Sequence, residues 1–276
     1  MYIVSTPIGN LEDITLRALR VLKEVDLIAA EDTRRTRQLL THYGIHKPLI
    51  SYHEHNRRMR EKTLLNDLSE GKSIALVTDA GTPGISDPGE ELVRGAVQAG
   101  IPLVSIPGPV ALVAALSVSG LPTESFLFYG FLPSKAAARK KWLTSLKERP
   151  ETLVFYESPR RLGSLLDDAA QVLGERRVVV AREMTKVYEE VYRGTISEIL
   201  EQLGKEEVKG EVTVIVEGCT SLPRVDASAI LEALKRYSEE MGLSVKDSVD
   251  RVAEDLGISR RQVYQESLKW KKESGE

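Results

Sequence analysis

Apolar runs of strand length alternate, in the first part of the chain, with segments in which apolar residues recur at helical spacing. This alternation predicts a largely parallel sheet covered by helices, in which ligands bind outside the carboxyl ends of the strands. The predicted strands are Tyr2–Ser5, Leu27–Ala30, Leu49–Tyr52, Ile74–Thr78 and Leu103–Ile106. The predicted helices between them are Leu11–Lys23, Thr33–Tyr43, Arg57–Ser69 and Glu90–Ala99.

A second group of strands and helices follows a Gly/Pro break at Leu121–Pro122, where we place a domain boundary. The spacing through Val191–Val216 leaves room for hairpins, so the sheet in this half can be mixed rather than parallel. The predicted strands are Phe126–Phe131, Leu153–Tyr156, Val178–Arg182, Val191–Arg193 and Val212–Val216. The predicted helices are Ala136–Leu146, Ser158–Leu173 and Ile196–Leu203.

After SLPRVD the pattern changes to short helical segments with no strand among them: Ala227–Glu240, Val245–Leu256 and Arg260–Lys269. Within them, AEDLGISRRQVYQ has an alanine, a turn glycine and a buried aliphatic residue at helix-turn-helix spacing. The predicted organisation is an α/β domain at residues 1–120, a second α/β domain at 121–222 and a small helix-turn-helix-like domain at 223–276.

The composition is that of an ordinary globular protein, with 42% hydrophobic and 29% charged residues. The net charge of −3 argues against a surface that coats nucleic acid all over, but it permits a local basic face. Cys219 is the single cysteine, which excludes an intrachain disulfide and a cysteine-based metal site. No apolar run approaches the length needed to span a bilayer, and no signal-peptide pattern is visible. We therefore expect a cytoplasmic enzyme or binding protein.

Loops that follow the predicted strands hold most of the candidate chemistry. VTDAGTPGISDPG (Val77–Gly89) runs from a strand into a loop of glycine, proline and small residues with almost no bulky side chains. TPIGNLED (Thr6–Asp13) makes a sharp turn before a helix. PGPVALVAALSVSG (Pro107–Gly120) begins a slim helix, with Pro109 expected at its first position.

Two further strand-end loops are charged. AEDTRRTRQLL (Ala30–Leu40) has two acids followed by three arginines near a helix N-terminus, where the helix dipole disfavours cations. A structural ion-pair cluster is one explanation, and arginines that face a partner are the other. SYHEHNRRMREK (Ser51–Lys62) combines two histidines with three arginines. It fits an anionic polymer better than a metal ion, because its histidines have no recognised ligand spacing.

The familiar nucleotide-binding and hydrolase motifs are missing from the sequence. It contains no G-x-G, no Walker pattern and no G-x-S-x-G elbow. A nucleotide-like ligand of the loop Val77–Gly89 must therefore be held by another geometry. Asp87, at the far end of this loop, either touches such a ligand or caps the next helix.

Six motifs, in their order along the chain, together resemble the tetrapyrrole-methylase superfamily: TPIGNLEDIT, AEDTR, VTDAGTPGISDPG, IPGPVALVAAL, FYGFLP and VFYESPRR. The match covers essentially residues 1–218. Within the superfamily, the chain is most similar to the bacterial enzymes that methylate a cytidine ribose 2′-hydroxyl in small-subunit ribosomal RNA. The resemblance implies two α/β domains with S-adenosylmethionine in the cleft between them. It also implies a cytoplasmic, homodimeric methyltransferase that acts on ribosomal RNA in an assembled subunit, without a metal ion.

The same resemblance implies that the cofactor touches strand-end loops of both domains. Backbone groups of a glycine- and proline-rich loop suit its polar parts, and Asp79 suits its ammonium group or a ribose hydroxyl. The implied cofactor residues are Pro7, Ile8, Asp79, Ala80, Gly81, Ile85, Ser86, Val110, Ala111, Phe128, Tyr129, Tyr156 and Thr213.

The implied reaction is an in-line displacement, in which an oxygen attacks the methyl carbon. A ribose 2′-hydroxyl is a poor nucleophile at neutral pH, so a nearby base should help. The sequence does not choose among five candidate bases, which are Glu31, Asp32, His53, Glu183 and Lys186. We favour the acids of AEDTR, Glu31 and Asp32, as catalytic residues, with Arg34 orienting the RNA.

RNA also requires basic loops near the cleft. The candidates are Arg34, Arg35, Arg37, Arg57, Arg58, Arg60, Lys135, Arg139, Lys140, Lys141, Arg160 and Arg161. Two alternatives stay open. One is a precorrin-type tetrapyrrole methyltransferase of the same fold, because a tetrapyrrole is also polyanionic. The other is a small-molecule-sensing, DNA-binding regulator that uses the helical tail.

Overall fold

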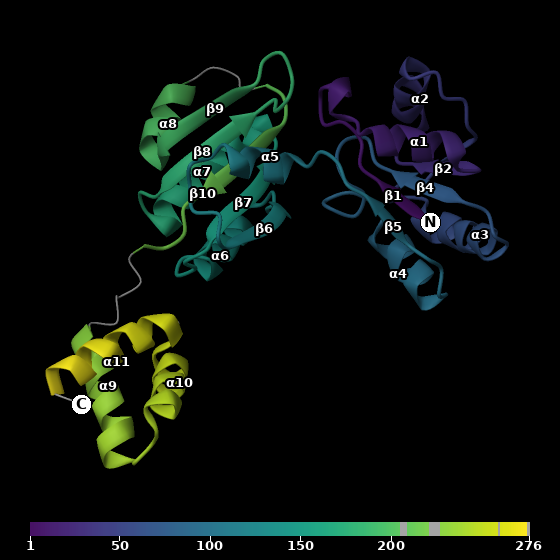
Figure 1. The fold of residues 1–276 in the computed structure, drawn as a ribbon. Coiled ribbons are helices and arrows are strands. Elements are labelled where there is room, and N and C mark those ends of the chain that lie inside the picture. Colours follow the sequence, from purple (N-terminus) through teal and green to yellow (C-terminus); the bar gives the residue numbers. More distant parts are fainter. Residues whose placement is uncertain (205–208, 221–226, 259, 275–276) are drawn as a thin grey trace. The chain divides into compact units, whose positions relative to one another are not determined.

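The computed structural model describes residues 1–204, 209–220, 227–258 and 260–274, and it divides into two compact units, Met1–Cys219 and Thr220–Glu276 (Figure 1). The first unit holds two five-stranded sheets, and the described part of the second unit is helical. The predicted fold class, α/β with C-terminal helices, is confirmed. Every helix in these described ranges is too short or too polar to span a bilayer.

The first sheet is parallel throughout, as the alternation of strands and helices predicts. Its strands lie in the order β3-β2-β4-β1-β5. The central strand β4 is buried along its whole length, and burial on both faces explains its uninterrupted apolar sequence IALV. The strands are β1 (Tyr2–Val4), β2 (Leu27–Ala30), β3 (Leu49–Ser51), β4 (Ile74–Val77) and β5 (Val104–Ile106).

Helices cover both faces of this sheet. On one face, Leu22 of α1 and Leu40 of α2 pack in one cluster with Ile28. On the other face, Leu64 of α3 and Leu92 of α4 belong to the cluster that contains Leu76. The strand ends are therefore the part of the sheet left free for a ligand. The helices are α1 (Leu16–Glu24), α2 (Thr33–His42), α3 (Arg57–Ser69) and α4 (Glu90–Gln98).

The helix predicted at Leu11–Lys23 is interrupted near its start. The Asn10 side chain accepts a hydrogen bond from Glu12 N and begins a short 3₁₀ turn, η1 (Leu11–Asp13). The Thr15 side chain then accepts from Ala18 N and caps α1. Two successive N-caps thus split one apolar pattern into two elements.

The second sheet is mixed, in the order β6-β7-β10-β8-β9. Strands β6 and β7 are parallel, whereas β10 is antiparallel to both β7 and β8, and β8 and β9 form an antiparallel pair. The mixed sheet that the spacing allows is confirmed. The strands are β6 (Phe126–Phe131), β7 (Thr152–Glu157), β8 (Arg177–Arg182), β9 (Glu190–Thr195) and β10 (Val212–Val216).

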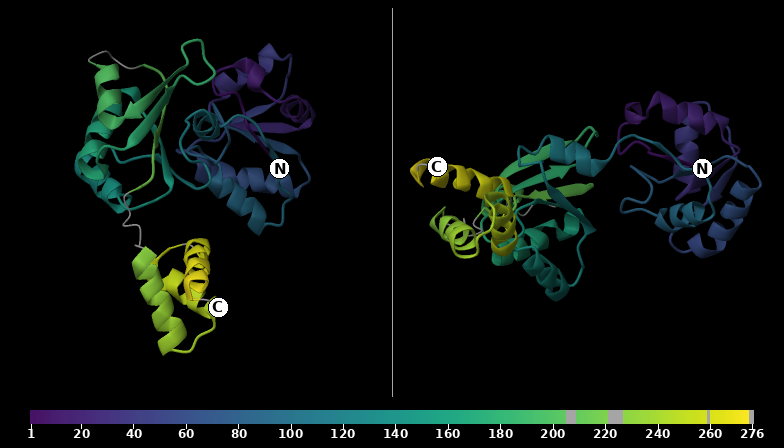
Figure 2. Two further views of the ribbon diagram at one scale, coloured as in Figure 1. Left: turned by 60° about the vertical axis from the view of Figure 1, so that its left-hand side comes forward. Right: turned by 60° about the horizontal axis from the view of Figure 1, so that its bottom comes forward.

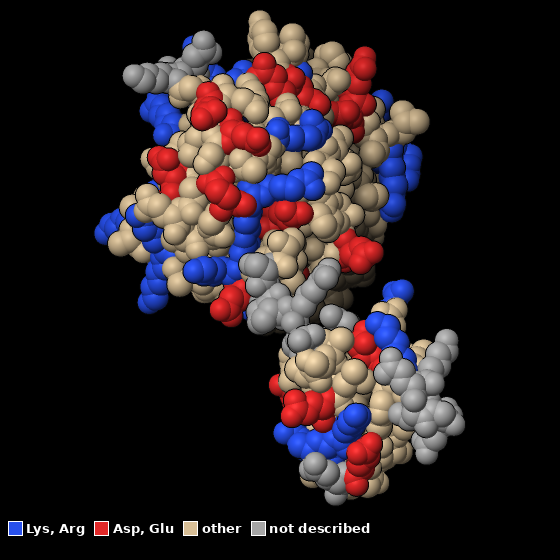
Figure 3. All heavy atoms as spheres, turned by 90° about the vertical axis from the view of Figure 1, so that its left-hand side faces the viewer, with Lys and Arg blue, Asp and Glu red and all other residues tan. Residues whose placement is uncertain are grey.

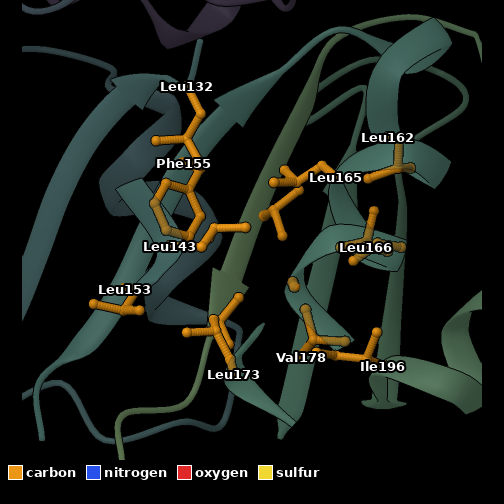
Figure 4. Packing of buried hydrophobic residues seen from close by; sticks show 14 of the residues in the cluster. Leu132, Leu143, Leu153, Phe155, Leu162, Leu165, Leu166, Leu173, Val178 and Ile196 are labelled. Carbon is orange, nitrogen blue, oxygen red and sulfur yellow. The ribbon is translucent and has the colours of Figure 1, made fainter. Parts of the chain in front are cut away.

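One face of the second sheet carries the largest apolar core of the chain's described part. Figure 4 shows Phe155 of β7 beside Leu143 of α6, with Leu162 and Leu166 of α7 in the same core. The helices on this face are α6 (Ala136–Ser145), α7 (Pro159–Leu173) and α8 (Ile196–Leu203).

The opposite face of the second sheet is covered by α5 (Ala111–Ser117). Along the chain, α5 follows β5 of the first sheet. Its Leu112 and Leu116 pack in one cluster with Val154 and Ile215 of the second sheet. The chain therefore passes from one sheet to the other before α5 begins. Pro109 was expected at the first position of this helix, and that expectation is wrong. Val110 is the N-cap, so Pro109 precedes the helix.

The unit Thr220–Glu276 folds around its own small core. Leu234, Val249, Val252 and Val263 are buried there, and its helices gather around them (Figure 2). Gly257, with φ of +61°, adopts the left-handed conformation that ends one helix and turns the chain into the next. The predicted boundary at 222/223 lies outside the described residues. The elements are α9 (Ala227–Lys235), a π-helical turn η2 (Arg236–Glu240), α10 (Val245–Leu256) and α11 (Arg260–Ser274).

Candidate functional site

A cavity of about 440 Å³ lies at strand ends of both sheets, within the unit Met1–Cys219. One wall follows the carboxyl ends of β1, β2 and β4 and the segment after β5. The other wall follows the carboxyl ends of β6 and β7, the β8–β9 loop and the start of β10. Because β10 is antiparallel to β7, its first residues lie beside the last residues of β7. A strand-end position is where ligands of α/β sheets bind.

The glycine-rich loop after β4 is bound to the loop after β1. Thr6 N donates to Gly81 O at 2.9 Å, Gly81 N donates to Thr6 O at 3.0 Å, and the hydroxyls of Ser5 and Thr82 lie 2.7 Å apart. Gly81 has φ of +92°, and a Cβ added there would meet no atom closer than 3.7 Å. Its backbone conformation, rather than a lack of space, therefore requires glycine.

The second wall includes two aromatic rings. Phe131 and Tyr156 both line the cavity, with ring centroids 5.9 Å apart. The Tyr156 hydroxyl accepts a hydrogen bond from Leu112 N at 3.1 Å, in the first turn of α5, where the N-cap Val110 provides no side-chain acceptor. Burial raises the pKa of the Tyr156 hydroxyl, so the group stays neutral.

Acidic side chains line both walls, with Glu31, Asp79 and Asp87 on the first wall and Glu157 and Glu211 on the second. Among the described residues that line the cavity, five are carboxylates and one is a guanidinium; they are Glu31, Asp79, Asp87, Glu157, Glu211 and Arg35. Glu31 Oε2 accepts hydrogen bonds from Thr78 Oγ1 at 2.6 Å and from Asp79 N at 3.2 Å. Asp79 Oδ1 accepts from Asp32 N at 3.0 Å. These bonds connect the ends of the neighbouring strands β2 and β4.

Two of these acids have perturbed ionisation. Burial raises the pKa of the Asp79 carboxyl. Burial, together with the negative charge of Glu31, raises the pKa of Asp87 to about 6. Asp87 does not cap the next helix, because the N-cap of α4 is Gly89 and α4 has no side-chain cap. Of the two roles considered for Asp87, the position in the cavity wall agrees with contact to a ligand.

Most of the cofactor residues implied by the resemblance come together in this cavity: Ile8, Asp79, Ala80, Gly81, Ile85, Ser86, Val110, Ala111, Tyr156 and Thr213. Three do not line it. Pro7 is buried in the loop after β1. Phe128 packs with Tyr156 on the α5 face of the second sheet, whereas Tyr129, one residue further along β6, packs on the other face with Phe155. Whether these thirteen residues contact a cofactor stays a prediction.

Sequence reasoning did not assign the other lining residues to the cofactor site: Arg35, Thr82, Phe131, Glu157, Ser158, Pro159, Met184, Gly210, Glu211 and Val212. Those after β7 belong to the motif VFYESPRR, so their strand-end position was a usable signal. The residues from Gly210 to Val212 precede a strand, and only its antiparallel pairing brings them here.

The residues of AEDTR separate into two environments. Glu31 lines the cavity, and Asp32 and Arg34 do not. Asp32 is the N-cap of α2 and accepts from Arg34 N at 2.8 Å, and its other oxygen lies 2.6 Å from Arg34 Nη2. This hydrogen bonding by Arg34 holds the pKa of Asp32 well below its usual range. The ion-pair explanation therefore accounts for Asp32 and Arg34, and their catalytic role stays a prediction.

The other three candidate bases also lie outside the cavity lining. Lys186 Nζ is 2.8 Å from Glu183 Oε1, which also accepts from Glu211 N at 2.9 Å. These two residues fix the β8–β9 loop through their mutual ion pair. His53 lies in the loop after β3, the edge strand of the first sheet.

Two arginines expected to contact RNA are structural. Arg139 is 4% exposed and its Nη2 lies 2.6 Å from Asp168 Oδ2, so the expectation of an RNA contact is wrong for this residue. Arg161 donates to Leu132 O at 2.7 Å and pairs with Glu157 at 3.1 Å. The Arg139–Asp168 pair joins residues 29 positions apart and is not visible from local sequence, whereas Glu157 and Arg161 are only four residues apart. On the face in Figure 3, basic and acidic side chains are interspersed rather than segregated.

Known proteins share this fold. The family model of tetrapyrrole (corrin/porphyrin) methylases matches residues 1–200. The solved structure of a cobalt precorrin-4 methyltransferase is similar in fold, with a TM-score of 0.59 and 17% identity over 78% of this chain and 93% of that chain. The chain belongs to the tetrapyrrole methylase family, and the resemblance identified from its six motifs is confirmed.

Relatives at higher identity define its branch of the family. Ribosomal RNA small subunit methyltransferase I of Halalkalibacterium halodurans is 48% identical over 271 residues, which cover 96% of this chain and 93% of that protein. The protein of the same name from Thermotoga maritima is 51% identical over 218 residues, which cover 79% of this chain and 98% of that protein. The branch to which the chain belongs is therefore that of the ribosomal RNA small subunit methyltransferase I proteins.

Proposed function

We propose that the cavity binds S-adenosylmethionine and that the chain transfers a methyl group to the ribose 2′-hydroxyl of a cytidine in small-subunit ribosomal RNA. The relative from Halalkalibacterium halodurans, 48% identical over nearly the whole chain, supports ribosomal RNA as the acceptor. The observation that supports S-adenosylmethionine as the cofactor is the acid-lined cavity at the strand ends.

The lining fits S-adenosylmethionine in charge and size. The cofactor carries a sulfonium and an ammonium group against one carboxylate, so a cavity with five carboxylates and one guanidinium complements it. Its volume of about 440 Å³ lies within the usual range of ligand pockets, about 300–1,000 Å³. Ile8, Phe131 and Tyr156 provide apolar surface for an adenine ring.

In this proposal each part of the lining has its own task. Asp79 and Asp87 face the cationic groups of the cofactor, and the backbone of Ala80 and Gly81 binds its polar atoms. Ala111 keeps the start of α5 slim enough for the ligand to lie against it. The three implied residues outside the lining, Pro7, Phe128 and Tyr129, support the walls from behind.

S-adenosylmethionine, when bound, supplies a methyl group on a sulfonium that an oxygen nucleophile can take. The chain contributes orientation and a place for the hydroxyl proton. We assign the proton acceptor to Glu31, because its Oε2 is held by Thr78 and Asp79 while its Oε1 has no hydrogen-bond partner in the described part of the chain. In this assignment the 2′-hydroxyl loses its proton to Glu31 Oε1. Asp32 acts on the position of Glu31 through the start of α2.

The acids of the cavity repel phosphate groups, so we place the RNA backbone outside it. Only the target ribose enters, and exposed arginines of α2 and α3, such as Arg34, Arg37 and Arg58, contact the flanking phosphates. We further propose that the enzyme is cytoplasmic and meets its substrate as an assembled small subunit. We also propose that the enzyme is a homodimer.

A matched pair of variants on α5 tests the cofactor site. Ala111 lines the cavity, whereas Val113, two residues further along the same helix, is exposed outside it. Ala111→Phe should fill the cavity and weaken S-adenosylmethionine binding at least about 10-fold by calorimetry, which corresponds to ~1.4 kcal/mol. Val113→Phe should bind as the wild type does. If circular dichroism shows that both variants are folded and their affinities are equal, the cofactor does not bind in this cavity.

A transfer assay tests the acceptor. Labelled S-adenosylmethionine is incubated with the enzyme and, in parallel, small ribosomal subunits, naked ribosomal RNA and a tetrapyrrole. We expect label in the ribosomal samples, with the assembled subunit preferred. Label found only in the tetrapyrrole would contradict ribosomal RNA as the acceptor and would favour the precorrin-type alternative. Binding of operator-like DNA with no transfer at all would favour the regulator.

A further inference from the structure

The unit Thr220–Glu276 has an exposed groove that the methyl-transfer chemistry does not use. The groove has a volume of about 570 Å³ and lies along α10 and the start of α11. Its lining combines three cations with apolar side chains: Val245, Lys246, Val249, Arg260, Arg261 and Tyr264. These elements are the two helices of the helix-turn-helix, joined at Gly257.

Two of the three cations are available to a ligand. Arg260 pairs with Asp250 of α10. For Lys246 and Arg261, the described ranges of the chain contain no ion-pair partner within 4.0 Å. Two unpaired cations on adjoining helices make a local site for phosphate groups.

The exposed aromatic residue of the groove is not explained by the core. The core of this unit uses Val263 from the first turn of α11, whereas Tyr264, the next residue, is 54% exposed. An exposed aromatic ring next to cations is the combination that binds single-stranded nucleic acid, because every base has a face that can stack. Leu268, one turn further along α11, is also exposed and extends this apolar surface.

The charge of the whole unit favours a local contact over a general coat. Residues 220–276 include ten lysines and arginines against eleven aspartates and glutamates. A duplex bound along its backbone would meet these acids, whereas a few phosphates and one unstacked base would meet only the groove. The deep, narrow major groove of double-stranded RNA does not admit a recognition helix, which also favours a loop or single strand.

The comparison with relatives separates this unit from the methyl-transfer chemistry. The Thermotoga maritima relative matches over 98% of its own length but covers 79% of this chain. The unmatched fifth of the chain has the size of the unit Thr220–Glu276. A protein with the same name thus does without a segment of this size, and no described residue of this unit is among those that line the cavity.

We propose that the α10–α11 groove binds a single-stranded or looped segment of the RNA substrate, with Lys246 and Arg261 on phosphates and Tyr264 stacked on a base. This inference rests on the proposed function for the identity of its ligand. It adds a second RNA contact at a site separate from the cavity where the methyl group is transferred.

Charge reversal in the full-length protein tests the two cations. We expect the double variant Lys246→Glu/Arg261→Glu to bind small-subunit ribosomal RNA about 10-fold or more weakly in filter-binding assays. Its log affinity should depend less on log salt, by a slope of about 1 to 1.5 for two lost phosphate contacts on a single strand. The control Lys235→Glu/Arg251→Glu has the same net charge but changes exposed residues outside the groove. Equal weakening by both variants would overturn the assignment.

Substitutions of Tyr264 and the kinetics of methyl transfer provide a second test of the proposal. Tyr264→Ala should weaken RNA binding about 10-fold, and Tyr264→Phe, which keeps the ring, should restore it. In transfer assays the groove variants should raise KM for RNA and leave both kcat and the affinity for S-adenosylmethionine unchanged. An unchanged KM, or tighter binding of duplex DNA than of RNA through the same residues, would overturn the proposal. If the chain bound RNA without methylating it, and the groove variants lost that binding, the proposed function would be contradicted. The assignment of the groove to RNA binding would not be affected.

Discussion

Arg139 and Asp168 form an ion pair between α6 and α7, and removal of one partner tests whether this arginine is structural. Their side chains are 4% and 8% exposed, and Arg139 also donates to the carbonyl oxygens of Ser134 and Ser164. Removing one member of a buried pair costs about 3–5 kcal/mol. Lys140 Nζ lies 3.4 Å from the other oxygen of Asp168, so part of the compensation survives. We therefore expect the lower end, about 3 kcal/mol, for Arg139→Met.

A loss of this size lowers Tm by about 6–12 °C for a unit of roughly 200 residues, which thermal melts followed by circular dichroism will detect. Lys141→Met, an exposed position on the same helix, is the control and should change stability by less than about 0.5 kcal/mol. Arg139→Met/Asp168→Leu should recover most of the loss, because no charge is left unpaired. A single variant that melts like the wild type but binds ribosomal RNA more weakly would refute the structural assignment.

Three further variants test the cavity. For Asp87, the pKa of about 6 in the folded chain exceeds the ordinary 3.8, so stability should fall as pH rises from about 4 to 6. Asp87→Asn should remove this fall, on the order of 1 kcal/mol after solvent screening, in melts at pH 4.5 and 7; an unchanged pH dependence would contradict it. Gly81→Ala should cost about 1–2 kcal/mol and weaken S-adenosylmethionine binding several-fold by calorimetry, because φ at this position is +92°. Wild-type values would show that the loop tolerates a side chain. Tyr156→Phe leaves the amide of Leu112 unpaired and should cost about 0.5–1.5 kcal/mol in denaturant titrations, and no loss would mean that water replaces the hydroxyl.

The strands of the first sheet could be predicted closely because their signal is local. β2 and β4 are buried between helices on both faces, and their sequences are accordingly apolar without interruption. The loops after such strands carry the cavity, so motif position identified Ile8, Asp79 and Gly81 as members of one site.

What the sequence could not provide depends on pairing between distant segments. Arg139 has the same sequence signal as its exposed neighbours, and its burial depends on Asp168, 29 residues further along the chain. Glu211 enters the cavity only because β10 runs antiparallel to β7. The start of α5 was misplaced for a related reason, since its helix cap is completed by the hydroxyl of Tyr156 rather than by a local side chain.

The glycine-rich loop after β4 is explained only by the sequence and the structure together. Its bare backbone pointed to a ligand, and the positive φ of Gly81 and the bridge to Thr6 give a conformational reason for the same residues. The two explanations are compatible, because this conformation forms the wall on which Asp79 and Asp87 are mounted.

Nucleoside analysis of the product tests the proposed reaction most directly. Small ribosomal subunits that lack the modification are incubated with the enzyme and labelled S-adenosylmethionine, and their RNA is digested completely to nucleosides and separated by mass. We expect the label in 2′-O-methylcytidine, with none formed by the Ala111→Phe variant. Label on a base, or on a ribose of another nucleoside, would contradict the proposed reaction.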